Sequence, residues 1–462
     1  MSARVRALAL ALATAAALSC AGAAGAARAD ERAITTADVS ALDVIELQIA
    51  YTTLLARYYR AIPPRTLVDG ARNGIAADLL ARGIANAQLP YTPARVSAGD
   101  GGDLIDTMVF KQLARYGARV DGHGLVQAAV AGELGALHDP YTLLFRPKAF
   151  RTFNAFLGNE TFGGIGAVVS FDAATKDASI DRVLAGGPAD RGGLRAGDRI
   201  ESVDGKPVSQ IGGTALRDAL RGAIGTTVRL AVSRGAERLT FALVRARVRD
   251  PEVTTARFGA AGYVRLARFG DRAGEETAAA VRDLANGGAR AIVLDLRGNG
   301  GGYGDEATAV ASAFVPSGTI FTTRERSGAT VVAKATGAVA WTGPLAVLVD
   351  GDTASAAEIV AGAIQDHRAG TLVGARTFGK GVVQSVFPLP DGSAIKMTTA
   401  RYTTPSGRDI DHSGIAPDVA VAEPPGSRLG DPAADPQLAR ALEIVTLAAA
   451  PSSPAAASPG VL

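Results

Sequence analysis

Three patterns of apolar and polar residues follow one another along this 462-residue chain. From residue 30 to about 150, long Ala-, Leu- and Arg-rich segments with few β-branched runs predict helices. From about 152 to 248, alternating segments such as "TVRLAVSR" and "LTFALVRARV" stand between Gly-rich turns and predict short strands. From about 250 onward, apolar runs such as "ARAIVLDLRGN" alternate with helical segments, which predicts a sheet covered by helices.

These patterns favour a multidomain α+β fold. We expect a helical N-terminal region at 30–150, a small β domain at 151–248, and an α/β core with a mixed sheet at 249–425. Residues 426–462 are rich in Pro, Ala and Ser, which is typical of a tail that is disordered towards its end.

The predicted helical region contains a weak internal repeat with an offset of 58 residues. "LARY" at 55–58 recurs at 113–116, and several apolar or glycine positions correspond in the same way: Leu67, Val68, Ala71, Gly74 and Leu79 match Leu125, Val126, Ala129, Gly132 and Leu137. Two copies are too few for a solenoid. They fit a packing or dimerising module, so a homo-oligomer formed through these helices is one expectation.

The N-terminus resembles an export signal. Arg4 and Arg6 precede an apolar run, and "AARAD" offers a cleavage site after Ala29, so residues 1–29 are expected to be a signal peptide. The only cysteine, Cys20, lies in "ALSC", which leaves a lipid anchor open as an alternative to soluble export. Cleavage after Ala29 would leave no cysteine for disulfides or thiol chemistry. We therefore expect an exported protein, periplasmic or associated with the cell envelope.

Charge and histidine spacing exclude several functions. The formal net charge is +3 without a dense basic block, which gives no argument for nucleic-acid binding. The four histidines, His123, His138, His367 and His412, show no metal-ligand spacing. No metal and no cofactor are expected from the sequence.

Candidate chemistry begins with "VDGDTASAAEIVAGAIQDH", an apolar strand leading into a helix. Ser355 and Glu358 form an S-x-x-E capping box, which places Ser355 at or near the helix N-terminus. A hydroxyl there lies beside free N–H groups and the positive end of the helix dipole, an environment that stabilises an oxyanion. For an isolated S-x-x-E pattern, a plain helix cap is the favoured explanation.

A lysine and a glycine turn add to this serine. Only seven of the 48 basic residues are Lys, yet Lys380 stands between two glycines in "TFGKGVVQSV". A desolvated lysine can lose its proton and act as a general base, whereas arginine cannot. "LDLRGNGGG" is a buried strand ending in Asn and three glycines, which brings backbone amides to the edge of the sheet where sites gather.

In their order and in their residues, these segments resemble a known family. "LDLRGNGGG", "DTASAAEIVAGAIQD", "TFGKGVVQ", "TTARYTTPSGRDID" and "GIAPDVAV" are similar to the carboxyl-terminal processing peptidases, or tail-specific proteases. "GGIGAVVSF" with "GPADRGGLRAGDRIESVDG" resembles their embedded PDZ domain, and "LHDPYT" resembles the motif that precedes it. The resemblance covers about residues 110 to 425 and implies a serine endopeptidase without a cofactor.

The resemblance also implies roles for single residues. The nucleophile falls on Ser355, the general base on Lys380, and the residue orienting that lysine on Gln384, which would share a strand face with Lys380. The remaining positions are an oxyanion hole and residues that shape or support the site: Gly300, Gly301 and Ala356 for the hole, and Glu358, Thr377 and Asp366 around it. Gly300 stands where the family often has Pro.

The PDZ resemblance implies recognition of a free C-terminus. The amides around Gly164, Ile165 and Gly166 would receive the terminal carboxylate of a protein or peptide substrate with an apolar end, while that peptide adds to a sheet edge. The chain's own end, Val461 and Leu462, suggests that its tail could bind such a groove.

Two alternatives remain. A Ser–His hydrolase would use His367 or His412, although no Gly-x-Ser-x-Gly elbow is present. A catalytically inactive PDZ adaptor on a protease scaffold would bind without cleaving.

Overall fold

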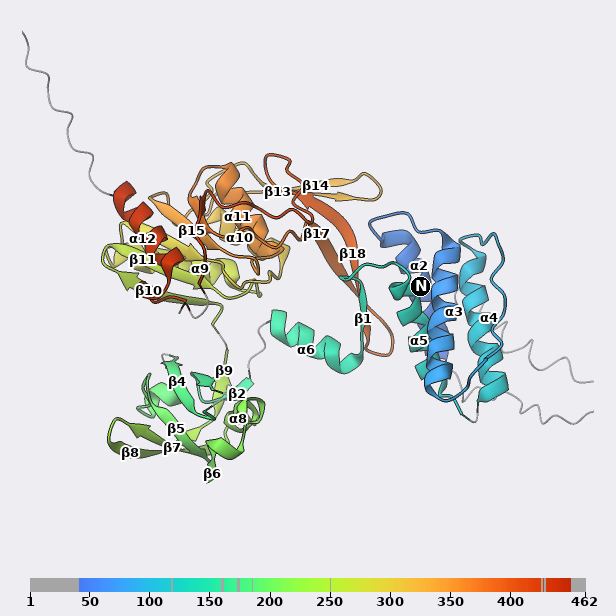
Figure 1. Ribbon diagram of the computed structural model, residues 1–462, viewed down its shortest axis with the longest axis horizontal. Helices are drawn as coiled ribbons and strands as arrows, with labels where there is room; N and C mark the ends of the chain where they lie inside the picture. The colour runs from blue at the N-terminus through green and yellow to red at the C-terminus, as the bar shows by residue number, and fades with distance from the viewer. Residues whose placement is uncertain are drawn as a thin grey trace, which may run out of the picture. The chain divides into compact units, whose positions relative to one another are not determined.

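The computed structural model describes residues 41–449, apart from 118, 159–161, 173–174, 185, 250, 425–426 and 428 (Figure 1). The predicted signal peptide with Cys20 and the chain end at Val461 and Leu462 lie outside the described residues. The chain forms two compact units. Unit 1 comprises Met1–Thr152, Gly318–Lys334 and Phe378–Ile415; unit 2 comprises Phe153–Ser317, Ala335–Thr377 and Ala416–Leu462.

Four of the helices described in unit 1 pack together: α2 (Ala41–Arg57), α3 (Pro64–Ala81), α4 (Asp100–Tyr116) and α5 (Gly122–Gly135). The 58-residue repeat matches α2–α3 to α4–α5. Its equivalent glycines, Gly74 and Gly132, meet where α3 crosses α5. A Cβ atom on Gly74 would lie 3.0 Å from the Gly132 Cα and 2.1 Å from the Ala128 carbonyl oxygen. Only glycine permits so close an approach of two helix backbones. The predicted helical N-terminal region is therefore confirmed.

An antiparallel sheet completes unit 1. Its strands are β1 (Leu143–Phe145), β13 (Thr319–Glu325), β14 (Thr330–Lys334), β17 (Val382–Pro388) and β18 (Ala394–Thr403), in the order β1-β18-β13-β14 with β17 also paired to β18. Leu389, Ile395 and Met397, from the β17–β18 hairpin, are buried in the same apolar core as the four helices. The hairpin and the helix bundle therefore share one core.

The main sheet of unit 2 contains β10 (Val253–Phe258), β11 (Ala261–Leu266), β12 (Ala291–Asp295), β15 (Leu345–Val349), β16 (Thr371–Gly374) and β19 (Val419–Ala420), in that order. β10 pairs antiparallel with β11 and the other pairs are parallel, which confirms the predicted mixed sheet. Every residue of β12 and β15 is buried, as expected for apolar strands covered on both faces.

Helices cover this sheet. They are α9 (Ala273–Asn286), α10 (Gly304–Ser312), α11 (Ala356–Asp366) and α12 (Pro436–Ala449). Helix α12 lies within 426–462, which the sequence analysis assigned to a Pro-, Ala- and Ser-rich tail without predicting a helix there. Leu438, Ala441 and Val445 repeat at helical spacing and are buried against alternate residues of β12 and β15. The apolar stripe on α12 outweighed the Pro- and Ala-rich composition around it.

A smaller antiparallel sheet of unit 2 forms the β domain. Its strands are β3 (Ala167–Phe171), β4 (Ala178–Val183), β5 (Arg199–Val203), β7 (Thr227–Arg234) and β8 (Glu237–Val244), in that order, with β6 (Lys206–Pro207) paired to β5. The helices α7 (Pro188–Arg191) and α8 (Gly213–Leu220) accompany it, and β2 (Phe162–Gly164) pairs with β9 (Ala246–Val248). None of the described helices has the length and apolar character that crossing a membrane requires.

Candidate active site

Ser355 lies in the turn between strand β15 and helix α11. It is the residue before α11 and has φ 58° and ψ −118°, which is rare for a residue other than glycine. Such a backbone costs about 1–3 kcal/mol and is typical of functional sites. The Ser355 N–H donates to Oε2 of Glu358 at 2.9 Å, so the acidic end of the predicted capping box holds this turn.

Glu358 connects the serine turn to a second segment. Its side chain is fully buried, and its other oxygen, Oε1, accepts a hydrogen bond from Oγ1 of Thr377 at 2.5 Å. The sequence placed Glu358 and Thr377 around the site, and the structure brings them into direct contact. One carboxylate therefore fixes both the backbone of Ser355 and the segment that follows β16.

The glycine turn after β12 lies against Ser355. A Cβ atom on Gly301 would be 2.8 Å from the Ser355 Cβ and 2.9 Å from the Ala356 nitrogen. The Ala354 N–H also donates to the Asn299 carbonyl at 2.9 Å, which joins the two turns. Gly301 and Ala356, two of the three predicted oxyanion residues, thus lie beside Ser355.

The amides of this turn are not equivalent. The Gly301 N–H donates to Oδ1 of Asn299 at 2.9 Å. The N–H groups of Gly300 and Ala356, by contrast, have no hydrogen-bond acceptor among the described residues. Gly300 and Ala356 are the better candidates for binding an oxyanion in this arrangement.

Three polar residues that the sequence analysis missed support the two turns; Asn299 and Thr353 are buried, and Asp350 is half-buried. Asn299 donates through Nδ2 to the Leu266 carbonyl at 2.9 Å, which fixes the glycine turn to β11. Thr353 donates through Oγ1 to the Leu296 carbonyl at 3.0 Å, and Asp350 accepts from the Gly298 N–H. All three lie inside the motif segments. Their polar side chains in an otherwise apolar sequence were the signal that could have identified them as supports of the site.

Arg297 anchors the glycine turn from the other side. Its side chain is only 1 % exposed, and it donates to both oxygens of Asp295 and to both oxygens of Asp435. Such bidentate pairs are strong and geometrically specific. Although burial opposes it, hydrogen bonding from Arg297 lowers the pKa of the Asp435 carboxyl. Asp435 precedes α12, so the helix that the sequence missed is tied to the turn beside Ser355.

Lys380 and Gln384 belong to unit 1. The Nζ of Lys380 lies 5.0 Å from the centre of the Tyr141 ring, a cation–π distance, and Gln384 donates to Thr398 at 3.4 Å. Lys380 precedes β17, and the pairing register shifts between Val383 and Gln384. The argument that residues 380 and 384 share a face of one regular strand was therefore wrong.

The "LHDPYT" segment forms the turn that carries Tyr141. Oδ1 of Asp139 accepts from the Tyr141 N–H at 2.9 Å, and Oδ2 accepts from Oγ1 of Thr142 at 2.7 Å. Thr142 in turn accepts from the Thr398 N–H at 3.2 Å. This turn places an aromatic ring against Lys380. Through Thr142 it also contacts Thr398 on β18, the residue whose hydroxyl accepts the hydrogen bond from Gln384.

The far end of α11 carries Asp366 and His367. His367 caps the C-terminus of the helix whose N-terminus holds Ser355. Eleven residues at 1.5 Å each separate the two ends by about 16 Å. His367 is thus too distant to accept the Ser355 proton, and Asp366 is too distant to touch the reacting atoms.

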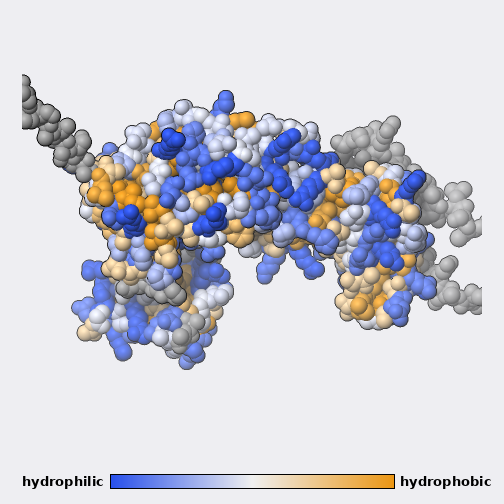
Figure 2. All heavy atoms as spheres, turned by 45° about the horizontal axis from the view of Figure 1, so that its top comes forward, coloured by the Kyte–Doolittle hydropathy of each residue, from blue (hydrophilic) through white to orange (hydrophobic). Residues whose placement is uncertain are grey.

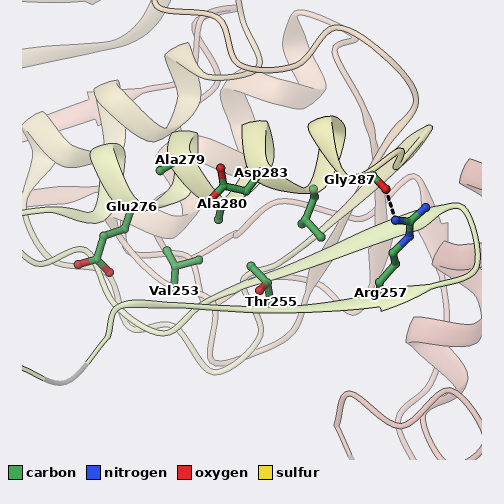
Figure 3. A pocket seen from close by; sticks show the side chains of 9 residues that line it. Val253, Thr255, Arg257, Glu276, Ala279, Ala280, Asp283 and Gly287 are labelled. Atoms are coloured by element: carbon green, nitrogen blue, oxygen red, sulfur yellow. Dashed lines mark hydrogen bonds between the residues drawn. The ribbon is translucent and has the colours of Figure 1, made fainter. Parts of the chain in front are cut away.

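A groove elsewhere in unit 2 lies between β10 and α9, lined by residues such as Thr255, Arg257, Glu276 and Asp283 (Figure 3). β10 is the edge strand, three strands from β15, which corresponds to about 14 Å. The groove contains none of the predicted site residues.

Comparisons with known proteins match both parts of the resemblance. Residues 260–421 match the peptidase family S41, and residues 179–234 match a PDZ domain. A carboxyl-terminal-processing protease of Synechocystis is 36% identical over 327 residues, covering 69% of this chain and 76% of the relative. A carboxy-terminal-processing protease of Bartonella bacilliformis is 36% identical over 341 residues, covering 68% and 76%.

The chain belongs to the carboxyl-terminal-processing protease family. A solved structure, the photosystem II D1 C-terminal processing protease, is 28% identical, with a TM-score of 0.46, and covers 82% of this chain and 93% of its own. Membership in this family of S41 peptidases confirms the resemblance drawn from the motifs, including the PDZ domain within the β region. The chain is therefore a protease of the C-terminal processing family, for which proteins or peptides are the expected substrates.

Proposed function

We propose that this protein is an exported serine endopeptidase that cleaves proteins near an apolar free C-terminus. Ser355 is the nucleophile and Lys380 the general base in this proposal. The observation that carries it is the packing of Gly301 against Ser355 at the N-terminus of α11. A serine in a strained turn, beside backbone amides and a helix dipole, has the surroundings of an acyl-transfer site.

The proposed reaction runs through an acyl-enzyme. Lys380 takes the Ser355 hydroxyl proton as Oγ bonds to the scissile carbonyl carbon, and the carbonyl oxygen becomes an oxyanion held by the Ala356 N–H and the glycine turn. The C–N bond then breaks, and the proton passes to the leaving amine. Water then attacks the ester carbonyl carbon and gives one proton to the Lys380 amine. As the ester C–O bond breaks, Lys380 returns that proton to Ser355 Oγ, and the new C-terminus is released.

Covalent reach supports the pairing of Ser355 with Lys380. Thr377 is bound to Glu358, which also binds the Ser355 N–H. Only Phe378 and Gly379 lie between Thr377 and Lys380, so the Cα atoms of these two residues are at most about 11 Å apart. Arginine at this position would keep its charge and could not accept the proton. Gln384 is proposed to orient the lysine amine.

The PDZ domain is proposed to supply substrate choice. β3 is the edge strand of its sheet, and Phe171 on β3 is the side chain nearest to Gly213, where α8 begins. A strand edge beside a helix suits β-augmentation by an extended peptide. The buried turn at Gly164, Ile165 and Gly166 directly precedes β3. This turn is proposed to receive the terminal carboxylate.

The proposal is tested with two peptides that differ only at the end, one with an apolar free C-terminus and one amidated. Cleavage is followed by mass spectrometry with wild type, Ser355→Ala, Lys380→Ala and Lys380→Arg. We expect cleavage of the free-ended peptide alone, with activity lost in all three variants. Binding without cleavage in wild type would instead favour the inactive PDZ adaptor. Cleavage that survives in Lys380→Ala would remove the proposed base.

A further inference from the structure

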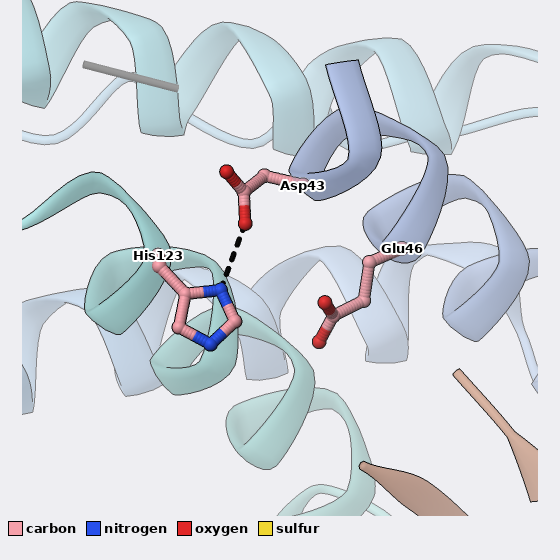
Figure 4. A group of neighbouring side chains, drawn as sticks. All are labelled: Asp43, Glu46 and His123. Atoms are coloured by element: carbon pink, nitrogen blue, oxygen red, sulfur yellow. Dashed lines mark hydrogen bonds and ion pairs between the residues drawn. The ribbon is translucent and has the colours of Figure 1, made fainter. Parts of the chain in front are cut away.

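A group of charged side chains in unit 1 lies among the helices and the β17–β18 hairpin. Asp43 and Glu46 lie on α2, and His123 lies on α5 (Figure 4). One ligand atom from each of the three lies within 4.8 Å of the others. The histidine spacing gave no hint of this group, because its other members are two carboxylates, 80 and 77 residues before His123 in the sequence.

Glu46 is the observation that points to a missing ligand. Its side chain is 1 % exposed, and its Oε1 has no hydrogen-bond donor among the described residues. Figure 4 shows its carboxylate directed toward the imidazole of His123. A buried carboxylate without a donor is costly unless a proton or a cation neutralises it.

Two further carboxylates lie near Glu46, and the imidazole of His123 contacts both of them. Nδ1 of His123 lies 2.8 Å from Oδ1 of Asp43, and its Nε2 lies 3.4 Å from Oδ2 of Asp391 in the β17–β18 turn. Three carboxylates thus surround one imidazole.

We propose that Asp43, Glu46 and His123 bind one divalent transition-metal ion, for which Zn²⁺ is the probe. Imidazole together with carboxylates favours Zn²⁺ and related ions over Mg²⁺ or Ca²⁺, which prefer oxygen ligands alone. Metal bonds of about 2.0–2.2 Å place neighbouring tetrahedral ligands about 3.3 Å apart. Small rotations of three side chains that already lie within 4.8 Å would reach this spacing.

Asp391 gives the site an outer partner. If Nδ1 of His123 binds the ion, Nε2–H faces Asp391, which is the usual way a carboxylate fixes a metal-bound imidazole. Asp391 is itself held by Gln127 on α5 at 2.9 Å. A bound ion would therefore fasten α2 to α5 and, through His123, to the hairpin that begins just after Lys380.

The test uses untagged full-length protein stripped with a chelator, exposed to Zn²⁺, Mn²⁺ or Mg²⁺, and desalted. Metal content is measured by mass spectrometry, and thermal unfolding reports stabilisation of the folded state. We expect about one Zn²⁺ per chain and a melting temperature several degrees higher, with no such rise in Mg²⁺. Retention of no Zn²⁺, or an equal rise in Mg²⁺, would overturn the proposal.

Variants locate the ion. Glu46→Gln and His123→Gln should each weaken Zn²⁺ binding at least tenfold. Glu133→Gln is the matched control, because Glu133 is another fully buried carboxyl on α5 that lies outside the cluster, and it should bind like wild type. Zn²⁺ retained equally by Glu46→Gln would contradict the site. Asp43→Asn replaces Glu46→Gln as the decisive variant if circular dichroism shows that the latter does not fold.

Discussion

Gly301 and Ser355 approach so closely that position 301 has no room for a side chain. A Cβ atom there would lie 2.8 Å from the Ser355 Cβ and 2.9 Å from the Ala356 nitrogen. The backbone of Gly301 also has φ +97°, which residues with a side chain rarely adopt. The glycine therefore sets the distance between the turn after β12 and the proposed nucleophile.

Gly301→Ala should lower kcat/KM for the free-ended peptide at least 100-fold, because the added methyl group pushes the serine turn away from the glycine turn. Gly300→Ala is the matched control, since a Cβ atom on Gly300 meets nothing within 4 Å. That variant keeps its N–H and should stay within a few-fold of wild type. Equal activity of the two variants would show that the close contact does not matter for catalysis.

The hydroxyl of Thr377 should matter through Glu358. Thr377→Val keeps the shape but removes the hydrogen bond to a buried carboxylate that also holds the Ser355 N–H. Losing one partner of a buried charged group costs about 1–3 kcal/mol, so we expect kcat to fall about 10- to 100-fold with KM little changed. Thr377→Ser retains the hydroxyl and should recover most of the rate. A Thr377→Ser variant as slow as Thr377→Val would mean that the methyl group, not the hydroxyl, is required.

The pair of Arg297 and Asp435 should be a main support of unit 2. Asp435→Asn leaves a buried guanidinium without its second carboxylate, which typically costs about 3–5 kcal/mol. We expect a clearly lower melting temperature together with lower activity, because Arg297 stands two residues before Asn299 in the glycine turn. Thermal unfolding and peptide cleavage measure the two effects.

A surface pair provides the control for Asp435. Arg440 and Glu443 on α12 pair at 2.6 Å, but both side chains are largely exposed. Glu443→Gln should change the free energy of unfolding by less than about 0.5 kcal/mol. A loss for Asp435→Asn no larger than for Glu443→Gln would contradict the anchoring role of the buried pair.

Much of the fold could be predicted because burial, helix capping and close backbone packing each leave a pattern in neighbouring residues of the sequence. The all-apolar strands β12 and β15, the capping box at Ser355 and the glycine pair of the repeat each have a direct physical signature. Helix α12 was missed because composition was weighed above its buried stripe of Leu438, Ala441 and Val445. The bulge before Gln384 was missed because irregular pairing leaves no mark on alternation.

The groups that the sequence could not bring together are distant along the chain. Asp435 reaches Arg297 across 138 residues, and His123 reaches Asp43 across 80. No spacing rule covers such contacts, since only tertiary packing decides them. Buried polar residues inside motifs, such as Asn299, could have been recognised as structural supports.

The stability of unit 2 should depend on pH through Glu252. Burial raises the pKa of the Glu252 carboxyl to about 7, and the negative charge of Glu276 adds to the shift. A carboxyl whose pKa is raised in the folded protein binds its proton more tightly there than in the unfolded chain. Folding stability therefore falls as pH rises from about 4.5 to about 7, and the full penalty is present above that range.

Glu252→Gln removes this penalty because glutamine stays neutral and can still accept the Gly270 N–H bond that Glu252 receives at 3.0 Å. Relative to wild type, we expect the variant to gain about 1–3 kcal/mol at pH 8 and little at pH 5. Thermal unfolding at the two pH values measures the gain. Glu275→Gln, at an exposed carboxyl on α9, should show no comparable rise. A gain for Glu252→Gln that is the same at both pH values would show that Glu252 is charged in the folded protein throughout this range.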